Sequence, residues 1–179
     1  DLQAMFGAIH AIVGGLMDAR NFYIGVYDPA GGLLSFPYFV DTEDVTPAPK
    51  KLGKGLTEYV LRTGQPLLAS PQAFDDLVRR GEAENIGAPS VDWLGVPLKA
   101  AEQSFGVLVV QSYTENVRFT EQDKEILTFV SQQVANAIEH IAVGGIDRVL
   151  VEIQGAARVH DAVIDAVADQ QGALDFVGA

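Results

Sequence analysis

The sequence contains no cysteine, and this absence excludes several classes of site at once. Without a thiol, the chain cannot form disulfides, bind zinc or an iron–sulfur cluster through Cys, or hold a cofactor by a thioether bond. Histidine is scarce as well, and its three positions are His10, His140 and His160. No uncharged apolar run approaches the roughly 18 residues of a membrane-spanning helix. These absences favour a cytoplasmic protein without a covalently attached cofactor.

Positive charge is also in short supply, with 12 Lys and Arg against 24 Asp and Glu and a net charge of −12. Phosphate backbones and anionic lipids are bound through Lys and Arg, so we expect neither nucleic acid nor membrane as a partner. The 179 residues are 48% hydrophobic and 20% charged, which is typical of a folded domain. The chain begins with Asp1 and has no signal-peptide pattern, so we expect a piece of a longer protein.

Apolar periodicity predicts the elements of the first half of the chain. Residues 2–16 carry apolar side chains three and four positions apart, which indicates an amphipathic helix. Residues 22–27 and 33–40 are rich in aromatic and β-branched types, and the Gly and Pro residues between them indicate a β-hairpin. Pro37 predicts a bulge or a weakened second strand. A loop is expected over 41–51.

The second half alternates short helices with strands. A short helix is expected over 55–64 and another over 71–80, with a brief strand at 65–69. Residues 93–98 and 105–113 are the strongest strands and predict an antiparallel pair. A long helix follows Thr120, the expected N-cap, with Asp123 three residues later. Together these elements predict an α+β domain with a mostly antiparallel sheet.

Three stretches carry a resemblance to a known family. The first is Gly53–Pro66, a G-x-G, short helix, T-G-x-P segment. The second is the strand pair Trp93–Leu98 and Phe105–Gln111, which contains Val-Pro-Leu and then Gly-Val-Leu. The third is Phe119–Asp123, which opens the last helix. In this order the stretches resemble a GAF domain, the small-molecule sensing module of bacterial signalling proteins.

The resemblance covers residues 1–143 and leaves 144–179 as a C-terminal extension whose structure it does not indicate. It implies a GAF/PAS-like antiparallel sheet of five to six strands, with the terminal helices on one face. Short helices and loops would cover the other face and enclose a pocket. It also implies a homodimer formed through the first and last helices, in a two-component or related system. The same chain would continue into an effector domain, as in histidine kinases, diguanylate cyclases, phosphodiesterases or transcriptional regulators.

Several ligand classes of the family are disfavoured by the residues. The cyclic-nucleotide subtype has Asp-Glu where this chain has Asp123 and Lys124, and helix capping explains the remaining match. Bilin attachment and the sulfoxide-reducing enzymes of this fold need Cys, and a haem would need a pocket His. Asp75 and Asp76 could supply metal ligands, but adjacent acids on a short helix are more typical of a solvated face. We therefore expect no haem, no bilin and no metal.

A mostly apolar pocket for an unidentified small molecule is the site that remains. Eight residues on segments expected to face this pocket are candidates: Phe36, Tyr38, Tyr59, Leu68, Phe74, Leu77, Trp93 and Gln111. Each could equally fill the core, since a shift of one residue in strand phase turns a side chain to the opposite face. The sequence thus predicts a non-catalytic sensory module that relays ligand binding to an effector domain. The alternative is a dimerisation or spacer module without a ligand, whose large side chains fill the pocket.

Overall fold

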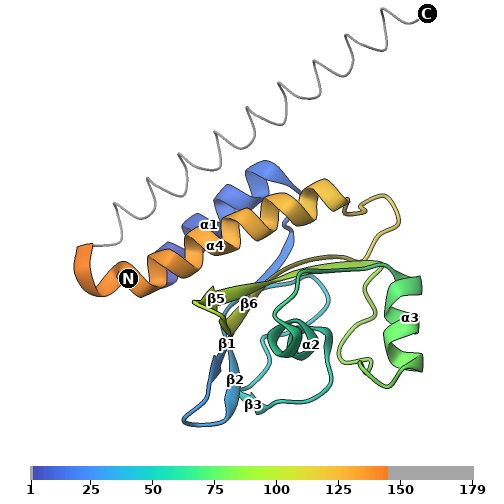
Figure 1. Ribbon diagram of the computed structural model, residues 1–179. Coiled ribbons are helices and arrows are strands. Elements are labelled where there is room, and N and C mark those ends of the chain that lie inside the picture. The colour runs from blue at the N-terminus through green and yellow to red at the C-terminus, as the bar shows by residue number, and fades with distance from the viewer. Residues whose placement is uncertain (1, 145–179) are drawn as a thin grey trace, which may run out of the picture.

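A computed structural model describes residues 2–144, which form one antiparallel sheet with helices on both faces (Figure 1). In chain order the elements are α1 (Leu2–Leu16), β1 (Asn21–Asp28), β2 (Leu33–Val40), β3 (Lys50–Lys51), α2 (Leu56–Thr63), β4 (Leu67–Ala69), α3 (Pro71–Arg79), β5 (Asp92–Ala100), β6 (Gln103–Ser112) and α4 (Glu121–Gly144). The strand order is β3-β2-β1-β6-β5-β4, and all neighbours are antiparallel. The predicted α+β class is confirmed, with six strands. The predicted extension lies outside the described residues from position 145 onward.

The terminal helices lie side by side on one face of the sheet (Figure 1). Alternate residues of the central strands point toward them, among them Ile24 of β1, Leu94 of β5 and Leu108 of β6, all fully buried. The helices contribute the 3.6-residue stripe that their sequences predict, including Ile9 from α1 and Leu127 from α4. This layer is the larger core of the protein.

The start of α4 is fixed from two sides. The backbone N–H of Asp123 donates to the Thr120 hydroxyl at 3.1 Å, and the Asp123 carboxylate accepts from the Thr120 N–H at 2.8 Å. The predicted capping box is thereby confirmed, with Asp in the usual place of Glu. Directly before Thr120, the Phe119 N–H donates to the carboxylate of Asp92 at 2.8 Å. Asp92 is the first residue of β5, so the sheet and the long helix are joined at this point.

The opposite face of the sheet carries α2, α3 and the connecting loops (Figure 1). A second apolar cluster lies here and includes Val60 of α2 with Val107 and Val109 of β6. The helix α2 ends at Gly64, whose φ of 62° is the left-handed conformation that glycine adopts most readily. Its N–H donates back to the Val60 carbonyl at 2.8 Å.

Two local features differ from the simple strand and loop pattern. The strand β3 falls inside the predicted loop 41–51, because two residues are too few to show a periodic pattern. In β2, Ile24 pairs with Tyr38 and Val26 pairs with Ser35, so two residues, Phe36 and Pro37, face one residue of β1. This is a β-bulge at the predicted proline, and it reverses the phase of the strand beyond it.

Candidate functional site

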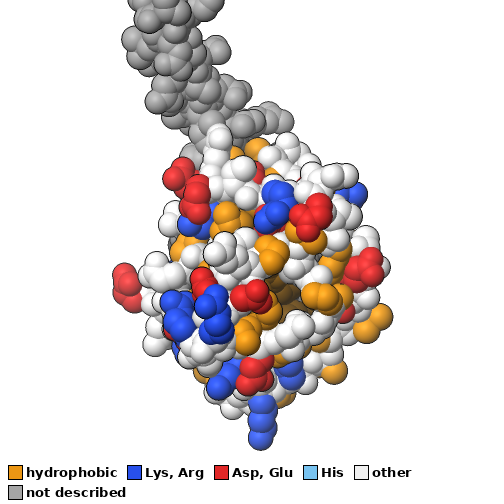
Figure 2. All heavy atoms as spheres, turned by 90° about the vertical axis from the view of Figure 1, so that its right-hand side faces the viewer, with side chains coloured by type: hydrophobic (Ala, Val, Ile, Leu, Met, Phe, Trp, Pro, Cys, Tyr) orange, Lys and Arg blue, Asp and Glu red, His pale blue; other side chains and the backbone are white. Residues whose placement is uncertain are grey.

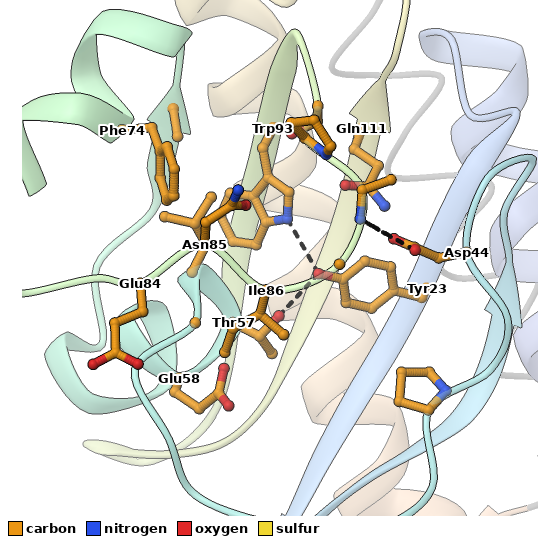
Figure 3. A pocket seen from close by; sticks show the side chains of 18 of the residues that line it. Tyr23, Asp44, Thr57, Glu58, Phe74, Glu84, Asn85, Ile86, Trp93 and Gln111 are labelled. Carbon is orange, nitrogen blue, oxygen red and sulfur yellow. Dashed lines mark hydrogen bonds between the residues drawn. The ribbon is translucent and has the colours of Figure 1, made fainter. Parts of the chain in front are cut away.

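A cavity of about 320 Å³ lies between the sheet and the elements that cover its second face (Figure 3). Its floor comes from β1, β2, β5 and β6, and its walls come from the N-terminal ends of α2 and α3. Two loops, residues 44–47 and 84–90, also line it, together with Lys50 of β3 and Ala69 of β4. On the face that Figure 2 shows, hydrophobic side chains gather around a recess. The volume is at the lower end of the range typical of small-molecule sites.

The floor is organised by a chain of hydrogen bonds around Tyr23. The Trp93 indole N–H donates to the Tyr23 hydroxyl at 3.1 Å, and that hydroxyl lies 2.9 Å from the Thr57 hydroxyl (Figure 3). These three residues come from β5, β1 and α2, so the chain joins the sheet to the helix that covers it. Burial raises the pKa of Tyr23 to about 12, because the phenolate would be removed from water.

The position of the Trp93 indole is possible only because Gly95 has no side chain. Gly95 follows two residues later on the same face of β5, and a Cβ built there would lie 2.1 Å from the indole ring. Ordinary carbon contacts are near 3.5–4.0 Å, so the ring occupies the space that any larger residue would fill. The sequence Trp-Leu-Gly thus lets the indole lie along the strand at 3% exposure.

Aromatic rings form much of the cavity wall, and we call Tyr23, Phe36, Phe39 and Trp93 the aromatic wall. The rings of Phe36 and Phe39 are nearly perpendicular, at 89° with centroids 6.1 Å apart. Tyr23 stacks on Phe39 at 5.1 Å and contacts Phe36 edge-on at 5.9 Å. Rings in two nearly perpendicular planes give a concave wall rather than a flat one. Phe74 approaches from α3 (Figure 3).

Four side chains of acidic or basic residues also line the cavity: Asp44, Lys50, Glu58 and Glu84. Glu58 is buried at 3% exposure in the first turn of α2, and its Oε1 lies 2.8 Å from the Lys50 ammonium. A buried carboxylate is stable in such a place because it is paired and because the helix N-terminus favours negative charge.

The two covering loops are linked through Asp44. Its carboxylate accepts hydrogen bonds from the Ala88 backbone N–H at 3.1–3.2 Å, which connects loop 44–47 to loop 84–90 (Figure 3). The Tyr113 hydroxyl donates to the same carboxylate at 3.4 Å and to Asp41 at 3.0 Å. Asp41 also accepts from the side-chain amide of Gln111 at 2.7 Å. Burial and the two carboxylates raise the pKa of Tyr113, so this hydroxyl remains a donor.

Four of the eight sequence candidates line the cavity, namely Phe36, Phe74, Trp93 and Gln111. Trp93 and Gln111 are directly opposite each other on β5 and β6. Tyr38 and Leu68 pack instead with the cluster under the terminal helices, and the Tyr38 hydroxyl lies 3.0 Å from His10 Nδ1. Strict alternation from Phe36 places Tyr38 on the cavity face, and the bulge at Pro37 makes that expectation wrong.

Two further candidates lie beside the cavity without lining it. Tyr59 sits on α2 with the Arg62 guanidinium 5.5 Å from its ring centre. Leu77 is buried one turn beyond Phe74 on α3 and is not part of the cavity lining. Conversely, sequence reasoning missed Tyr23, Phe39, Thr57, Glu58 and the loop 84–90. Thr57 and Glu58 lie inside the G-x-G and short-helix motif, and that motif was the available signal for them.

The raised pKa of Tyr23 makes the stability of the protein depend on pH in a predictable range. The folded state keeps the Tyr23 proton up to about pH 12, whereas the unfolded chain loses it near pH 10. The full contribution is therefore present below pH 10, and the unfolding free energy falls by about 2–3 kcal/mol between pH 10 and pH 12. Urea unfolding of wild type and Tyr23→Phe measures this, and we expect a shallower decline in the variant. Parallel declines would contradict the assignment.

The paired terminal helices, the antiparallel sheet and the covered cavity are the architecture that the resemblance to GAF domains implies. A family model described as "GAF domain" matches residues 1–139. The chain therefore belongs to the GAF family, whose members are generally regulatory modules. Within the described part of the chain, no helix is long and apolar enough to cross a membrane. Within that same part, no group of three or more His, Asp or Glu is placed to hold a metal ion.

Individual proteins show the same relationship. The nitrogen fixation protein AnfA from Azotobacter vinelandii is 26% identical over 110 residues, which are 61% of this chain and 21% of AnfA. The chain thus spans about a fifth of that relative. The GAF-B domain of DevS from Mycobacterium smegmatis is similar in structure, with a TM-score of 0.59, 19% identity, and 79% and 96% of the two chains covered. The GAF domain of a two-component sensor histidine kinase from Bacillus halodurans has a TM-score of 0.60 and 12% sequence identity. The match covers 80% of this chain and 97% of that domain. These likenesses show the fold.

Proposed function

We propose that this module binds a small molecule in the cavity of about 320 Å³ and relays its binding to an effector domain elsewhere in the same protein. The observation that carries the proposal is the cavity itself, which has aromatic walls, a few convergent polar groups and two covering loops. The GAF relatives support a sensory role, since one is a part of a protein named as a sensor histidine kinase.

The relay is proposed to run through β5. Trp93 lines the cavity, and its neighbour Asp92 accepts from the Phe119 N–H at 2.8 Å and pairs with Arg118 at 3.0 Å. A ligand that shifts Trp93 therefore acts on the residue that positions the start of α4. Coupling requires that the ligand bind one arrangement of β5 and α4 more tightly than another. The pairing of α1 with α4 supports the further proposal that two copies associate through these helices.

The spacer alternative requires that large side chains fill the second face of the sheet. Trp93 and Phe74 do lie there, but they line open space rather than close it, so the cavity favours the sensory reading. An enzymatic role has no comparable support. The sequence offers no thiol nucleophile, and His10, the histidine whose side chain the structure describes, does not line the cavity.

Native mass spectrometry of the freshly purified chain, followed by a thermal-shift screen of metabolites, tests the proposal. A bound ligand raises the melting temperature according to its concentration relative to Kd. We expect either excess mass per subunit or at least one metabolite that raises the melting temperature in proportion to its concentration. Bare polypeptide mass together with no shift across the screen would favour the spacer reading.

A substitution that fills the cavity gives the screen an internal control. Ala69 of β4 lines the cavity, so Ala69→Leu places added carbon atoms into open space. We expect ligand affinity to fall by more than about tenfold while the unfolding free energy changes by less than about 1 kcal/mol. Ala73→Leu makes the same change on α3 outside the cavity lining and is expected to leave affinity unchanged. Equal losses in both variants would show that the ligand binds elsewhere.

A further inference from the structure

The charges that line the cavity are unbalanced. Asp44, Glu58 and Glu84 supply three carboxylates, and Lys50 is the one basic residue of the lining. That ammonium is already paired with Glu58 at 2.8 Å. Asp44 receives hydrogen bonds from an amide and a phenol, which are neutral donors. Over residues 2–144, no Lys or Arg forms an ion pair with Asp44 or Glu84. A ligand in this cavity therefore meets a surplus of negative charge.

The aromatic wall, like the surplus of carboxylates, favours a cationic ligand. The face of an aromatic ring carries partial negative charge and attracts cations, most strongly where water is excluded. Tyr23, Phe36, Phe39 and Trp93 all line the cavity, and the ring of Phe36 stands nearly perpendicular to that of Phe39, on which Tyr23 stacks. A concave surface of this kind presents ring area to a compact ligand from more than one side. Phe74 adds a fifth ring from α3 (Figure 3).

The N-terminal ends of α2 and α3 also line the cavity and favour anions, but each carries a feature that reduces this attraction. The helix α2 has Glu58 in its first turn, so a carboxylate of the chain itself offsets the positive end of the helix dipole. The helix α3 is capped by the Ser70 hydroxyl, which accepts from the Ala73 N–H at 3.3 Å. Pro71 then occupies its first position and has no N–H to offer. The charge of Glu58 and the Ser70 cap therefore reduce the attraction of these helix ends for a phosphate or a carboxylate.

From this balance we propose that the cavity binds a compact organic cation, of the alkylammonium class, held against the aromatic wall with Asp44 and Glu84 as the uncompensated negative charges. The volume of about 320 Å³ limits the ligand to a small molecule. Anionic metabolites are disfavoured, because they would meet two carboxylates that no basic side chain compensates. This inference rests on the proposed function, since it names the class of ligand for the same cavity.

Three nearly isosteric probes separate charge from shape. Choline carries a trimethylammonium group, 3,3-dimethylbutan-1-ol has a neutral carbon in place of its nitrogen, and 3,3-dimethylbutanoate carries a negative charge. Binding is followed by calorimetry and by the fluorescence of Trp93, which is the single tryptophan of the chain. We expect choline to bind about tenfold more tightly than the neutral alcohol, and the anion to bind most weakly. The affinity for choline is expected to fall with added salt.

Matched variants locate the charge effect in the cavity. Glu84→Gln removes a charge from the lining and is expected to weaken choline several-fold while leaving the neutral alcohol unchanged. Glu82→Gln makes the same change at a residue that pairs with Arg80 outside the lining, and we expect no effect on either probe. Phe36→Leu keeps an apolar side chain but removes a ring, and it is expected to weaken choline more than the alcohol.

The outcomes that overturn the inference also show whether the proposed function survives. If the alcohol or the anion binds as tightly as choline, the cavity is a binding site but its preference is not for cations. If none of the three probes binds and the metabolite screen yields a ligand sensitive to Ala69→Leu, the cation class alone is wrong. If the probes and the screen both give nothing, the proposed function fails together with the inference.

Discussion

Replacing Asp92 by Ala is expected to lower the unfolding free energy by about 2–3 kcal/mol and the melting temperature by roughly 4–10 °C. The side chain of Asp92 is 3% exposed, and it accepts from the Phe119 N–H while pairing with Arg118. Its removal leaves a backbone donor without its partner at the start of α4, and an unsatisfied buried donor costs far more than an exposed one. Thermal and urea unfolding of the two proteins measure the loss.

The variant Asp92→Asn separates the two contacts of this carboxylate. The amide oxygen of Asn still accepts from the Phe119 N–H, whereas the charge that attracts Arg118 is gone. The Arg118 side chain is 46% exposed, so we expect the loss of this pair to cost about 1 kcal/mol or less. A cost in Asp92→Asn equal to that in Asp92→Ala would mean that the ion pair, and not the backbone hydrogen bond, anchors α4.

Adding a single methyl group at Gly95 is expected to destabilise the protein by about 1–3 kcal/mol. The new Cβ of Gly95→Ala would lie 2.1 Å from the Trp93 indole, so the ring must leave its place along β5. The hydrogen bond from the indole to Tyr23 is then broken, and the floor of the cavity is rearranged. Because Trp93 is the single tryptophan, its emission reports this movement directly and is expected to shift to longer wavelength.

Gly7→Ala is the matched control, because the added methyl group would lie in open space. No heavy atom lies within 4 Å of a Cβ placed there, and the residue is inside α1. We expect Gly7→Ala to stabilise the protein by about 0.5–1 kcal/mol, since alanine loses less backbone entropy in a helix than glycine does. Urea unfolding of both Gly→Ala variants tests the prediction, which is that the unfolding free energy falls for Gly95→Ala and rises for Gly7→Ala. A neutral Gly95→Ala with unchanged emission would show that the indole can be accommodated elsewhere.

The elements of the fold were readable from the sequence because their signals are local. The stripe of α1, the hairpin of β1 and β2 and the Thr120–Asp123 cap each depend on residues close together in the chain, and the structure confirms all three. The class of the sheet followed from the order of these elements. The strand β3 was not predicted, because two residues hold no period.

The site was only partly readable, because its lining depends on which face each side chain occupies. Trp93 and Gln111 were predicted to face the pocket, and both line it. Tyr38 was predicted to join Phe36, but the bulge between them turns Tyr38 toward α1 and brings Phe39 to the cavity instead. Whether any of these residues contacts a ligand remains a prediction that the binding experiments test.

By itself, the sequence determined the class of fold, the amphipathic faces of the terminal helices and the absence of thiol chemistry, because composition and short-range periodicity follow from the order of residues. The tertiary structure alone decided the phase of β2 beyond its bulge, the meeting of Trp93, Tyr23 and Thr57, and the surplus of carboxylates around the cavity. The two contacts of Tyr23 join residues that are 34 and 70 positions apart, and no local pattern records such contacts.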